Sequence, residues 1–304
     1  MQETPFPPVE TFAAKRLLSP VKPGEAGWFA ADHNMNLYRG CNHGCIYCDT
    51  RSECYRIDRF ETVRYKENCL SMLETELRQK KKPGIVSIGA ASDPYNALEA
   101  QLLITRQSLL LLKRYRFGVG MSTKSDLIAR DADVLAEMGA IAPVRTAFSI
   151  TAAEDELSLL LEPGAPATSA RFAALKVLAN AGVFAGVWVN PMLPFLTDSR
   201  ENLIALLRAT AKNGGRYAVC HFGMTLRTGN REYFFAALDK IPRFKGIKQQ
   251  YSNAFGLSYA CPSPQADALY ALFKEECHRL GLLWSFSAIN QAAKEACPQQ
   301  ISMF

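Results

Sequence analysis

The chain has 304 residues, of which 48% are apolar and 21% are charged, so its composition excludes a disordered or low-complexity protein. The formal net charge of +6 permits a nucleic-acid partner but does not require one. Nine cysteines, mostly scattered, favour a reducing cytosol over a disulfide framework. No signal-peptide pattern opens the chain, and no apolar run has the length of a membrane span. We therefore expect a cytoplasmic protein with no membrane partner.

The chain then alternates between short β-type runs and helical segments. Residues 1–33 are predicted to be extended and proline-containing, with a short helical stretch near residues 12–18. The predicted strands cover residues 35–38, 85–88, 117–122, 144–150, 184–189 and 217–222. Helices are predicted over 69–82 and 102–115, and after Ser125, Ser169 and Ser199, because serine is typical of a helix start. This alternation predicts βαβ units and a parallel sheet.

Six strands are too few for a closed eight-stranded barrel. A doubly wound sheet is the general alternative, but no G-x-G-x-x-G follows the first strand and no Walker lysine loop is present. The residues after about 225 are predicted to form a small α+β extension, with a helix over 265–280 and a strand over 282–286. We thus expect an N-terminal extension (1–33), a main α/β domain (34–225) and a C-terminal extension (226–304).

Three cysteines follow the first predicted strand at close spacing. Cys41, Cys45 and Cys48 form a C-x3-C-x2-C pattern. Thiolates are the ligands of iron–sulfur clusters, and three of them would hold three irons of a [4Fe–4S] cluster and leave the fourth open. A structural zinc site is the alternative, with His43 or Cys54 as the fourth ligand, although no second cysteine knuckle is present.

The cysteine spacing, with an aromatic residue before the last cysteine, resembles the signature of radical S-adenosylmethionine (SAM) enzymes. Five further stretches resemble the spore photoproduct lyase-like (DNA repair photolyase-like) branch of that superfamily. They lie at 87–96, 122–126, 148–151, 190–194 and 222–227, each at the end of a predicted strand. The resemblance covers residues 12–285 and implies a partial (β/α)6 TIM-type barrel with its chemistry at the carboxyl ends of the strands.

The resemblance also implies which residues bind SAM. In the lyase family SAM is held by an aromatic residue before the third cysteine, by serines after the second strand and on the fourth, and by a lysine after the third. The matching residues are Tyr47, Ser92, Ser149 and Lys124, and we add Asp93 and Asn190 as further polar candidates. A lysine ammonium can pair with the SAM carboxylate. Each Ser or Asp alone is equally typical of a strand-end turn, so only their joint placement favours a site.

The activity implied is reductive cleavage of SAM. An electron donor such as flavodoxin or ferredoxin would reduce the cluster, and SAM would yield methionine and a 5′-deoxyadenosyl radical that abstracts hydrogen from the substrate. The resemblance favours DNA as that substrate, in a photoproduct lyase-like repair reaction. Two alternatives stay open: a radical SAM enzyme acting on a peptide, tRNA or small metabolite, and a non-catalytic iron–sulfur protein that senses redox state or recruits a partner.

One departure from the family concerns the hydrogen donor. Spore photoproduct lyase has a cysteine just before the Ser-Asp pair of the second strand end, where this chain reads Ala90-Ala91-Ser92-Asp93. The other candidate donors are Cys54, Cys69, Cys220 and Cys261. Cys261 ranks first, because its neighbouring prolines predict a loop that could face the barrel mouth, whereas Cys220 lies in an apolar-patterned segment typical of a core.

Two features bear on macromolecular partners. The last residues, Gln300, Ile301, Ser302, Met303 and Phe304, resemble the peptide by which bacterial replication and repair proteins bind the sliding clamp, although an apolar tail packed on the body is the alternative. The segment after 225 interleaves basic and aromatic residues, namely Arg227, Arg231, Arg243, Lys245 and Lys248 with Tyr233, Phe234 and Tyr251. Such a segment is typical either of a groove that tracks phosphates and stacks bases or of a solvated amphipathic face.

Overall fold

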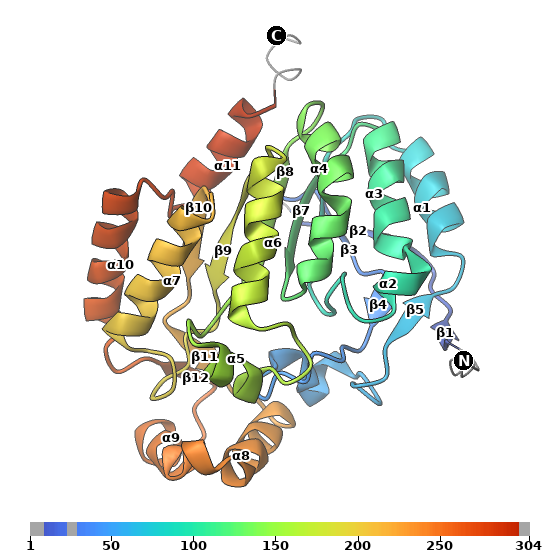
Figure 1. Cartoon of the computed structure of the whole chain (residues 1–304). Helices are drawn as coiled ribbons and strands as arrows, with labels where there is room; N and C mark the ends of the chain where they lie inside the picture. Colours follow the sequence, from blue (N-terminus) through green and yellow to red (C-terminus); the bar gives the residue numbers. More distant parts are fainter. Residues whose placement is uncertain (1–8, 23–28, 298–304) are drawn as a thin grey trace, which may run out of the picture.

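The computed structural model describes residues 9–22 and 29–297 of the chain (Figure 1). A seven-stranded sheet forms its centre. Its strands are β2 (Leu18–Pro20), β3 (His33–Met35), β6 (Ile85–Ile88), β7 (Gly118–Thr123), β8 (Val144–Ser149), β9 (Ala185–Val189) and β10 (Tyr217–Cys220). Their order is β10-β9-β8-β7-β6-β3-β2, and all neighbours are parallel except β2, which runs antiparallel to β3. Five of the six predicted strands are confirmed to within two residues, whereas the first, predicted at 35–38, is shifted to His33–Met35, and Tyr38 belongs to the separate strand β4 (Tyr38–Arg39).

Helices cover the outer face of the sheet, as Figure 1 shows. They are α1 (Cys69–Arg78), α3 (Ile104–Arg114), α4 (Ala132–Gly139), α6 (Thr168–Asn180) and α7 (Arg200–Lys212), with α10 (Ala266–Leu280) packed against α7. Apolar side chains of helices and strands meet in one core, in which Val86, Val119 and Leu135 have no exposed surface. In the described residues β2 and β10 do not pair, so the sheet is an open, partial barrel, as predicted.

The serine caps expected from the sequence are present at two helix starts. The Ser199 hydroxyl accepts a hydrogen bond from the Asn202 amide at the start of α7. The Ser125 hydroxyl accepts one from the Leu127 amide, where the 3-10 helix η3 (Asp126–Asp131) leads into α4. These bonds satisfy backbone donors that the first helical turn leaves unpaired.

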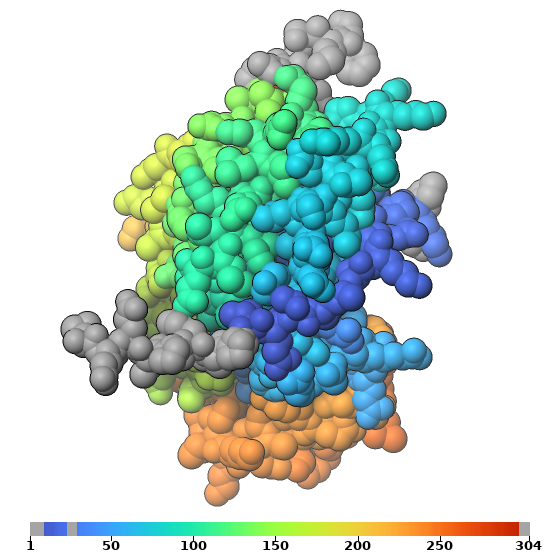
Figure 2. Space-filling model, turned by 90° about the vertical axis from the view of Figure 1, so that its right-hand side faces the viewer, coloured from blue at the N-terminus to red at the C-terminus, as the bar shows by residue number. Residues whose placement is uncertain are grey.

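The carboxyl ends of the parallel strands carry a second layer. The cysteine segment follows β4 (Tyr38–Arg39), which pairs with β5 (Arg64–Lys66) and, through it, with β1 (Thr11–Phe12). The C-terminal part adds the hairpin of β11 (Gly223–Thr225) and β12 (Ala260–Pro262), with helices α8 (Asn230–Lys240) and α9 (Ile247–Phe255). In Figure 2 the dark-blue N-terminal segment crosses the surface between the sheet's helices and this orange C-terminal layer.

The opposite end of the barrel is closed by apolar side chains. Helix α11 (Phe286–Glu295) places Ile289 and Ala293 in one cluster with Phe29, Ile85 and Tyr217. Figure 1 shows α11 at the end of the sheet that lies away from α8 and α9. Among the described residues, the cavity of the barrel opens at the end that carries the cysteine segment.

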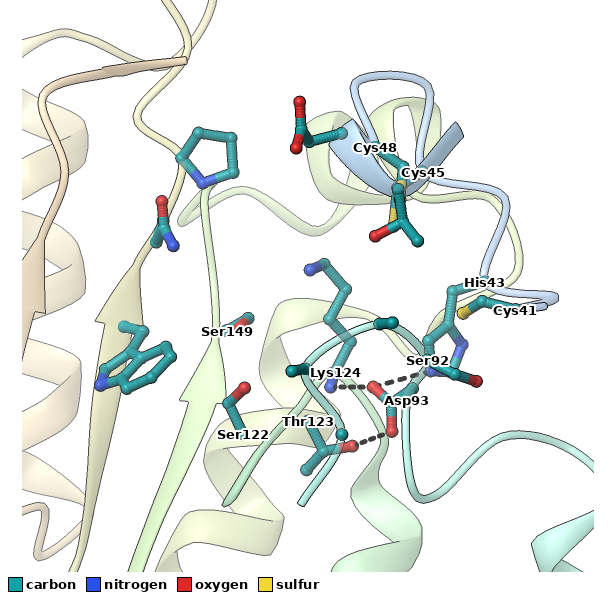
Figure 3. Close-up of a pocket in the computed structure, with 18 of the residues that line it drawn as sticks. Cys41, His43, Cys45, Cys48, Ser92, Asp93, Ser122, Thr123, Lys124 and Ser149 are labelled. Carbon is teal, nitrogen blue, oxygen red and sulfur yellow. Dashed lines mark hydrogen bonds and ion pairs between the residues drawn. The ribbon is translucent and has the colours of Figure 1, made fainter. Parts of the chain in front are cut away.

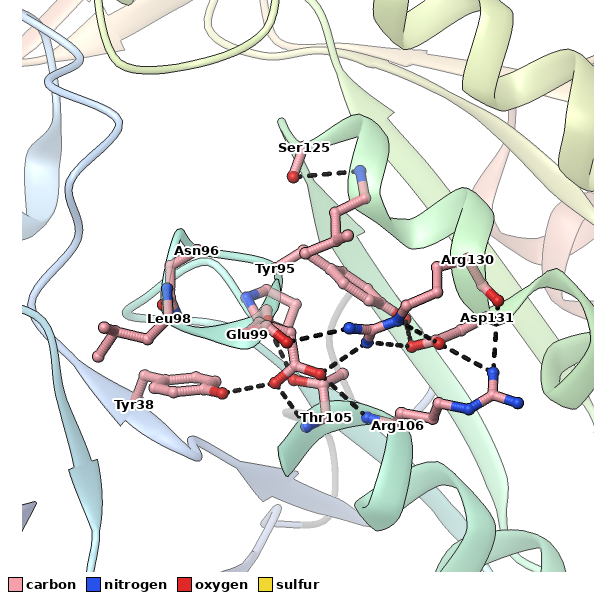
Figure 4. A network of polar contacts seen from close by, with 12 residues as sticks. Tyr38, Tyr95, Asn96, Leu98, Glu99, Thr105, Arg106, Ser125, Arg130 and Asp131 are labelled. Carbon is pink, nitrogen blue, oxygen red and sulfur yellow. Dashed lines mark hydrogen bonds and ion pairs between the residues drawn. The ribbon is translucent and has the colours of Figure 1, made fainter. Parts of the chain in front are cut away.

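A buried polar network fixes the strand that precedes the cysteines (Figure 4). Glu99, at the start of α2 (Glu99–Leu102), has no exposed surface. Its carboxylate accepts hydrogen bonds from the Tyr38 hydroxyl at 2.5 Å and the Thr105 amide at 2.8 Å, and it lies 2.7 Å from Arg130 Nη2. Burying this charge requires such partners, and together they tie β4 to the segments that follow β6 and β7.

Two local predictions were wrong. Residues 12–18 form no helix, because the Leu17 and Leu18 amides each donate to the Glu76 carboxylate at 2.7 Å and β2 then pairs with β3. Residues 282–286 form no strand beyond one bridge, from Leu283 to Tyr217 at the edge of the sheet. Ser285 instead caps α11, whose Ala288 amide donates to the serine hydroxyl at 3.2 Å. The first difference arises from contacts distant in the sequence, and the second from a local helix cap.

No helix within the described ranges is long and apolar enough to cross a membrane.

Candidate functional site

A cavity of about 730 Å³ opens at the carboxyl ends of the parallel strands. Nine of the predicted site residues line it: Cys41, Cys45, Tyr47, Cys48, Ser92, Asp93, Lys124, Ser149 and Asn190. They come from the cysteine segment and from the ends of β6, β7, β8 and β9. Figure 3 shows the cysteines on one side of this space and the Ser122 and Ser149 side chains on the other, with Lys124 extending between them. Parallel strand ends converge on one edge of a sheet, which is why residues so far apart in sequence meet.

The cysteine segment is a tight loop that depends on glycine at two turns. Gly40 has φ +80°, and a Cβ there would lie 2.5 Å from the Thr62 carbonyl oxygen. Gly44 has φ +67°, a backbone conformation that residues other than glycine rarely adopt. The Ile46 amide donates to the Leu161 carbonyl at 3.0 Å, which anchors the loop to the end of α5 (Asp155–Leu161). The conformation of the loop is thus fixed both by its own glycine turns and by a hydrogen bond to α5.

The donor set of this loop suits an iron–sulfur cluster. Cys41, Cys45 and Cys48 are free thiols that line the same cavity. Burial raises the pKa of the Cys41 thiol to about 11, so cluster assembly here would release protons from the thiols. Among the residues that the structure describes, no three His, Cys, Asp or Glu side chains converge on a single metal ion. All three thiols line the cavity, where each would ligate one iron of a cluster.

The two alternative zinc ligands have other contacts. His43 Nε2 lies 3.1 Å from Asp93 Oδ2, and its Nδ1 lies 3.3 Å from the Gly164 carbonyl oxygen. The exposed Cys54 thiol lies 3.4 Å from Arg227 Nη1. Both nitrogens of His43 therefore serve to hold the loop, which makes His43 a poor fourth ligand.

Asp93 is a buried carboxylate that joins the cysteine loop to β7. Besides His43, it accepts hydrogen bonds from the Thr123 hydroxyl at 2.6 Å and the Lys124 amide at 2.8 Å. Burial alone would raise its pKa, but His43 and these donors outweigh it and lower the pKa of Asp93 to about 2. Asp93 is therefore ionised at neutral pH and links the cysteine loop, through His43, to the end of β7.

Lys124 brings a positive charge into the cavity. Its side chain is 17% exposed, and its Nζ lies 5.7 Å from the centre of the Tyr47 ring. Burial works against the charged form, but nearby Cys45 and Glu162 raise the pKa of Lys124 above its ordinary value. An ammonium that remains charged beside an aromatic face is suited to bind a carboxylate-bearing ligand.

The other polar candidates lie at strand ends around Lys124. Ser92 is buried and its hydroxyl donates to the Gly40 carbonyl at 2.5 Å, which links the second strand end to the cysteine loop. Ser149 ends β8, and Asn190 directly follows β9. All three line the cavity together with Lys124.

The cavity lining also includes Asp49, Tyr55 and Tyr259, which are not among the site residues expected from the sequence. Asp49, directly after the last cysteine, accepts hydrogen bonds from the hydroxyls of Tyr55 and Thr225, each at 3.0 Å. Arg227 Nη2 donates to the Tyr259 hydroxyl at 2.7 Å, and Arg227 Nε lies 3.5 Å from Asp49. The β11–β12 hairpin brings Arg227 next to Tyr259, and such pairing cannot be read from local sequence. The one sequence signal for this region is the family resemblance at residues 222–227. The contacts of Asp49 join the cysteine loop to the C-terminal extension.

The structure corrects the expectation for Cys261. This residue lies in β12 rather than in a loop, opposite Met224 of β11, and has no exposed surface. It packs in an apolar cluster with Phe234 and Tyr251 and is not part of the cavity lining. Pairing with β11 turns its side chain into the core of the extension, so Cys261 is not placed to act as a hydrogen donor.

The basic and aromatic residues after 225 also separate in three dimensions. Phe234 and Tyr251 are fully buried, and Arg231 donates to the carbonyls of Leu226, Gly256 and Ser258. Arg243 pairs with Glu154 and Lys248 with Asp239. The charges of Arg231, Arg243 and Lys248 are thus used in contacts within the protein. Arg227 is the member of this set that faces the cavity.

Comparison with known families agrees with this arrangement. The sequence profile of the radical SAM superfamily matches residues 35–208, more than half of the chain. The chain therefore belongs to the radical SAM superfamily, whose members use a [4Fe–4S] cluster and SAM. The matched region runs from the last residue of β3 into α7 and includes the three cysteines and the strand ends that line the cavity.

Among relatives, the uncharacterized protein Rv2578c of Mycobacterium tuberculosis is 33% identical over 213 residues, which cover 68% of this chain. The match spans 62% of the length of that relative. The uncharacterized protein MJ0683 of Methanocaldococcus jannaschii is 30% identical over 189 residues, covering 61% of this chain and 68% of the relative.

Two solved structures are similar in fold. Spore photoproduct lyase complexed with dinucleoside spore photoproduct has a TM-score of 0.62 at 14% identity, covering 90% of this chain and 82% of that chain. The radical SAM methyltransferase TsrM from Kitasatospora setae has a TM-score of 0.55 at 11% identity, covering 86% of this chain and 61% of that chain. At these identities the likeness establishes the fold alone.

Proposed function

We propose that the chain is a radical SAM enzyme that abstracts hydrogen from a nucleic acid, in a DNA photoproduct lyase-like repair reaction. The observation that carries the proposal is a single cavity lined by three free cysteines, a lysine and several strand-end hydroxyl and amide groups. The fold likeness to spore photoproduct lyase, which is described in complex with a dinucleoside spore photoproduct, supports DNA as the substrate class. The mouth, with Arg227 against the Tyr259 ring at 4.6 Å, offers a cation and an aromatic face to a nucleotide.

In this proposal each group has a separate task. Cys41, Cys45 and Cys48 would hold three irons, and Lys124 would pair with the SAM carboxylate beside Tyr47. Ser92, Asp93, Ser149 and Asn190 would contact the remaining polar groups of SAM. When bound, the cluster and SAM supply one-electron chemistry that removes hydrogen from a substrate carbon, and the walls of the cavity orient the reactants and exclude water.

The first test uses the full chain, reconstituted anaerobically with iron and sulfide. After addition of dithionite and SAM, we expect about four irons per chain and formation of 5′-deoxyadenosine. A chain carrying Cys41→Ala, Cys45→Ala and Cys48→Ala is the control and should yield neither. Zinc in place of iron, or a cluster that never cleaves SAM, would refute the enzymatic proposal in favour of a structural or sensing role.

The substrate requires a second comparison. UV-irradiated and unirradiated DNA are supplied in parallel to the active enzyme, and photoproduct content is measured by mass spectrometry. Loss of photoproduct only with SAM and reductant supports lesion reversal. If irradiated DNA stays unchanged while 5′-deoxyadenosine forms, the substrate is of another class, and peptides, tRNA and small metabolites follow.

We also propose that the segment of residues 300–304 binds the bacterial sliding clamp. The segment lies outside the described residues, and the proposal rests on its sequence, a glutamine followed by the apolar residues Ile301, Met303 and Phe304. The full chain and a chain ending at Gln299 are compared for binding to purified clamp by surface plasmon resonance. Equal binding of both chains, or binding by neither, contradicts the proposal.

A further inference from the structure

A buried ion pair lies behind the part of the cavity wall that holds Tyr47, Lys124 and Ser149. Glu162 and Arg171 have no exposed surface, and Arg171 Nη2 lies 2.5 Å from Glu162 Oε2. Removing two charges from water is costly, and such a pair often contributes less stability than apolar side chains of similar size. The other contacts of the pair therefore indicate what it does.

Glu162 holds two residues of the expected SAM site through one oxygen. The Tyr47 hydroxyl donates a hydrogen bond to Glu162 Oε1, and Lys124 Nζ lies 3.9 Å from the same oxygen. Tyr47 is itself 5% exposed, so its hydroxyl points into the protein while its ring lines the cavity. A single carboxylate oxygen thus sets the separation between an aromatic ring and an ammonium group that face the same space.

Arg171 connects this carboxylate to the fourth strand of the barrel. Its Nη1 donates to the Ser149 carbonyl at 2.9 Å, and its Nε donates to the Pro166 carbonyl at 2.8 Å. The guanidinium therefore has partners on both sides and cannot rotate without breaking them. It fixes the orientation of Glu162 relative to the end of β8.

The backbone around Glu162 runs along the cysteine loop. The Leu161 carbonyl accepts from the Ile46 amide at 3.0 Å, and the Gly164 amide donates to the His43 carbonyl at 2.8 Å. Glu162 lies between these two bonds. These two bonds fix the position of the Glu162 backbone relative to the loop that carries the three cysteines.

We propose that Glu162 is a positioning residue that aligns Tyr47 and Lys124 for SAM, with Arg171 fixing the carboxylate. The inference rests on the proposed function, because it assumes that the cavity binds SAM. Glu162 itself does not line the cavity, so it acts through the two residues that it contacts. Its removal leaves Lys124 without its carboxylate neighbour and frees the Tyr47 hydroxyl, and both groups then lose their fixed relation to the cysteine loop.

The test compares three variants of the anaerobically reconstituted chain. Glu162→Gln keeps the shape of the side chain but removes its charge, and Tyr47→Phe removes only the hydroxyl that Glu162 accepts. Glu156→Gln is the matched control, since this carboxylate lies on the helix just before Glu162 and its side chain is 75% exposed. Iron per chain, melting temperature and the Kd for SAM are measured for each, the last by equilibrium dialysis.

We expect Glu162→Gln to weaken SAM binding about 10- to 100-fold, which is the range found when a residue that hydrogen-bonds to a metal ligand is replaced. Iron content should stay at the wild-type level, and the SAM-induced change in the electron paramagnetic resonance spectrum of the reduced cluster should be reduced. Tyr47→Phe should shift in the same direction, and Glu156→Gln should match the wild type. If Glu162→Gln does not fold, Tyr47→Phe decides.

Two other outcomes are distinguishable. Wild-type SAM affinity in folded, iron-loaded Glu162→Gln or Tyr47→Phe overturns the positioning role and leaves the proposed function intact. A wild-type chain that holds iron but binds no SAM refutes the proposed function, and the inference with it.

Discussion

The contact between the cysteine loop and Gly164 gives the sharpest structural prediction. A Cβ at this position would lie 2.2 Å from the Asn42 carbonyl oxygen and 3.0 Å from the His43 carbonyl carbon. Both are backbone atoms of the loop between Cys41 and Cys45, so neither can rotate away. We expect Gly164→Ala to push the loop outward by about 1 Å, since contacts between a Cβ and a backbone oxygen below 3.0 Å are essentially absent from real proteins.

The size of the effect follows from this overlap. Overpacking of a tight contact costs about 1–3 kcal/mol of unfolding free energy. For a chain of 304 residues that corresponds to a fall in melting temperature of roughly 2–5 °C. Because the displaced backbone carries the cysteines, we also expect reconstituted Gly164→Ala to hold less iron than the wild type.

The assay pairs differential scanning calorimetry with iron determination. Gly139→Ala is the control: Gly139 is the last residue of α4, and a Cβ there meets nothing within 4 Å. That substitution should leave the melting temperature unchanged or raised and the iron content normal. A Gly164→Ala chain with wild-type melting temperature and full iron content would refute the packing of residues 161–164 against the cysteine loop.

Three further predictions concern buried groups. Glu99→Ala removes the acceptor of the buried Tyr38 hydroxyl and leaves Arg130 with Asp131 as its remaining carboxylate, so it should cost about 1–3 kcal/mol in urea unfolding, and an unchanged urea midpoint would contradict the network. Cys261→Ala should leave photoproduct loss from irradiated DNA unchanged because its thiol packs away from the cavity, and inactivity would restore it as a donor. The pKa of Asp93 is about 2 when folded, below the ordinary 3.8, so its contribution of about 2 kcal/mol is present above pH 4 and lost as pH falls through 2. Melting temperatures between pH 5 and 2 should therefore fall less for Asp93→Asn than for the wild type, and equal slopes would contradict this.

Local sequence patterns determined most of the barrel. Short apolar runs separated by capped helices are enough to specify six parallel strands, because strand and helix periodicities and the Ser125 and Ser199 caps act over a few residues. The cysteine spacing is equally local. Parallel strands then bring their carboxyl ends to one edge, so polar residues at strand ends meet in one cavity without further information.

Contacts between distant residues were decided only by the tertiary structure. Tyr47 and Glu162 are 115 positions apart, and Asp49 and Thr225 are 176 apart, so no periodic pattern links them. Cys261 reads as a loop residue until β12 pairs with β11 and buries its thiol. Local propensity fixes which element a residue forms, whereas its partners depend on packing across the whole chain, where the free energy of burial outweighs local preference.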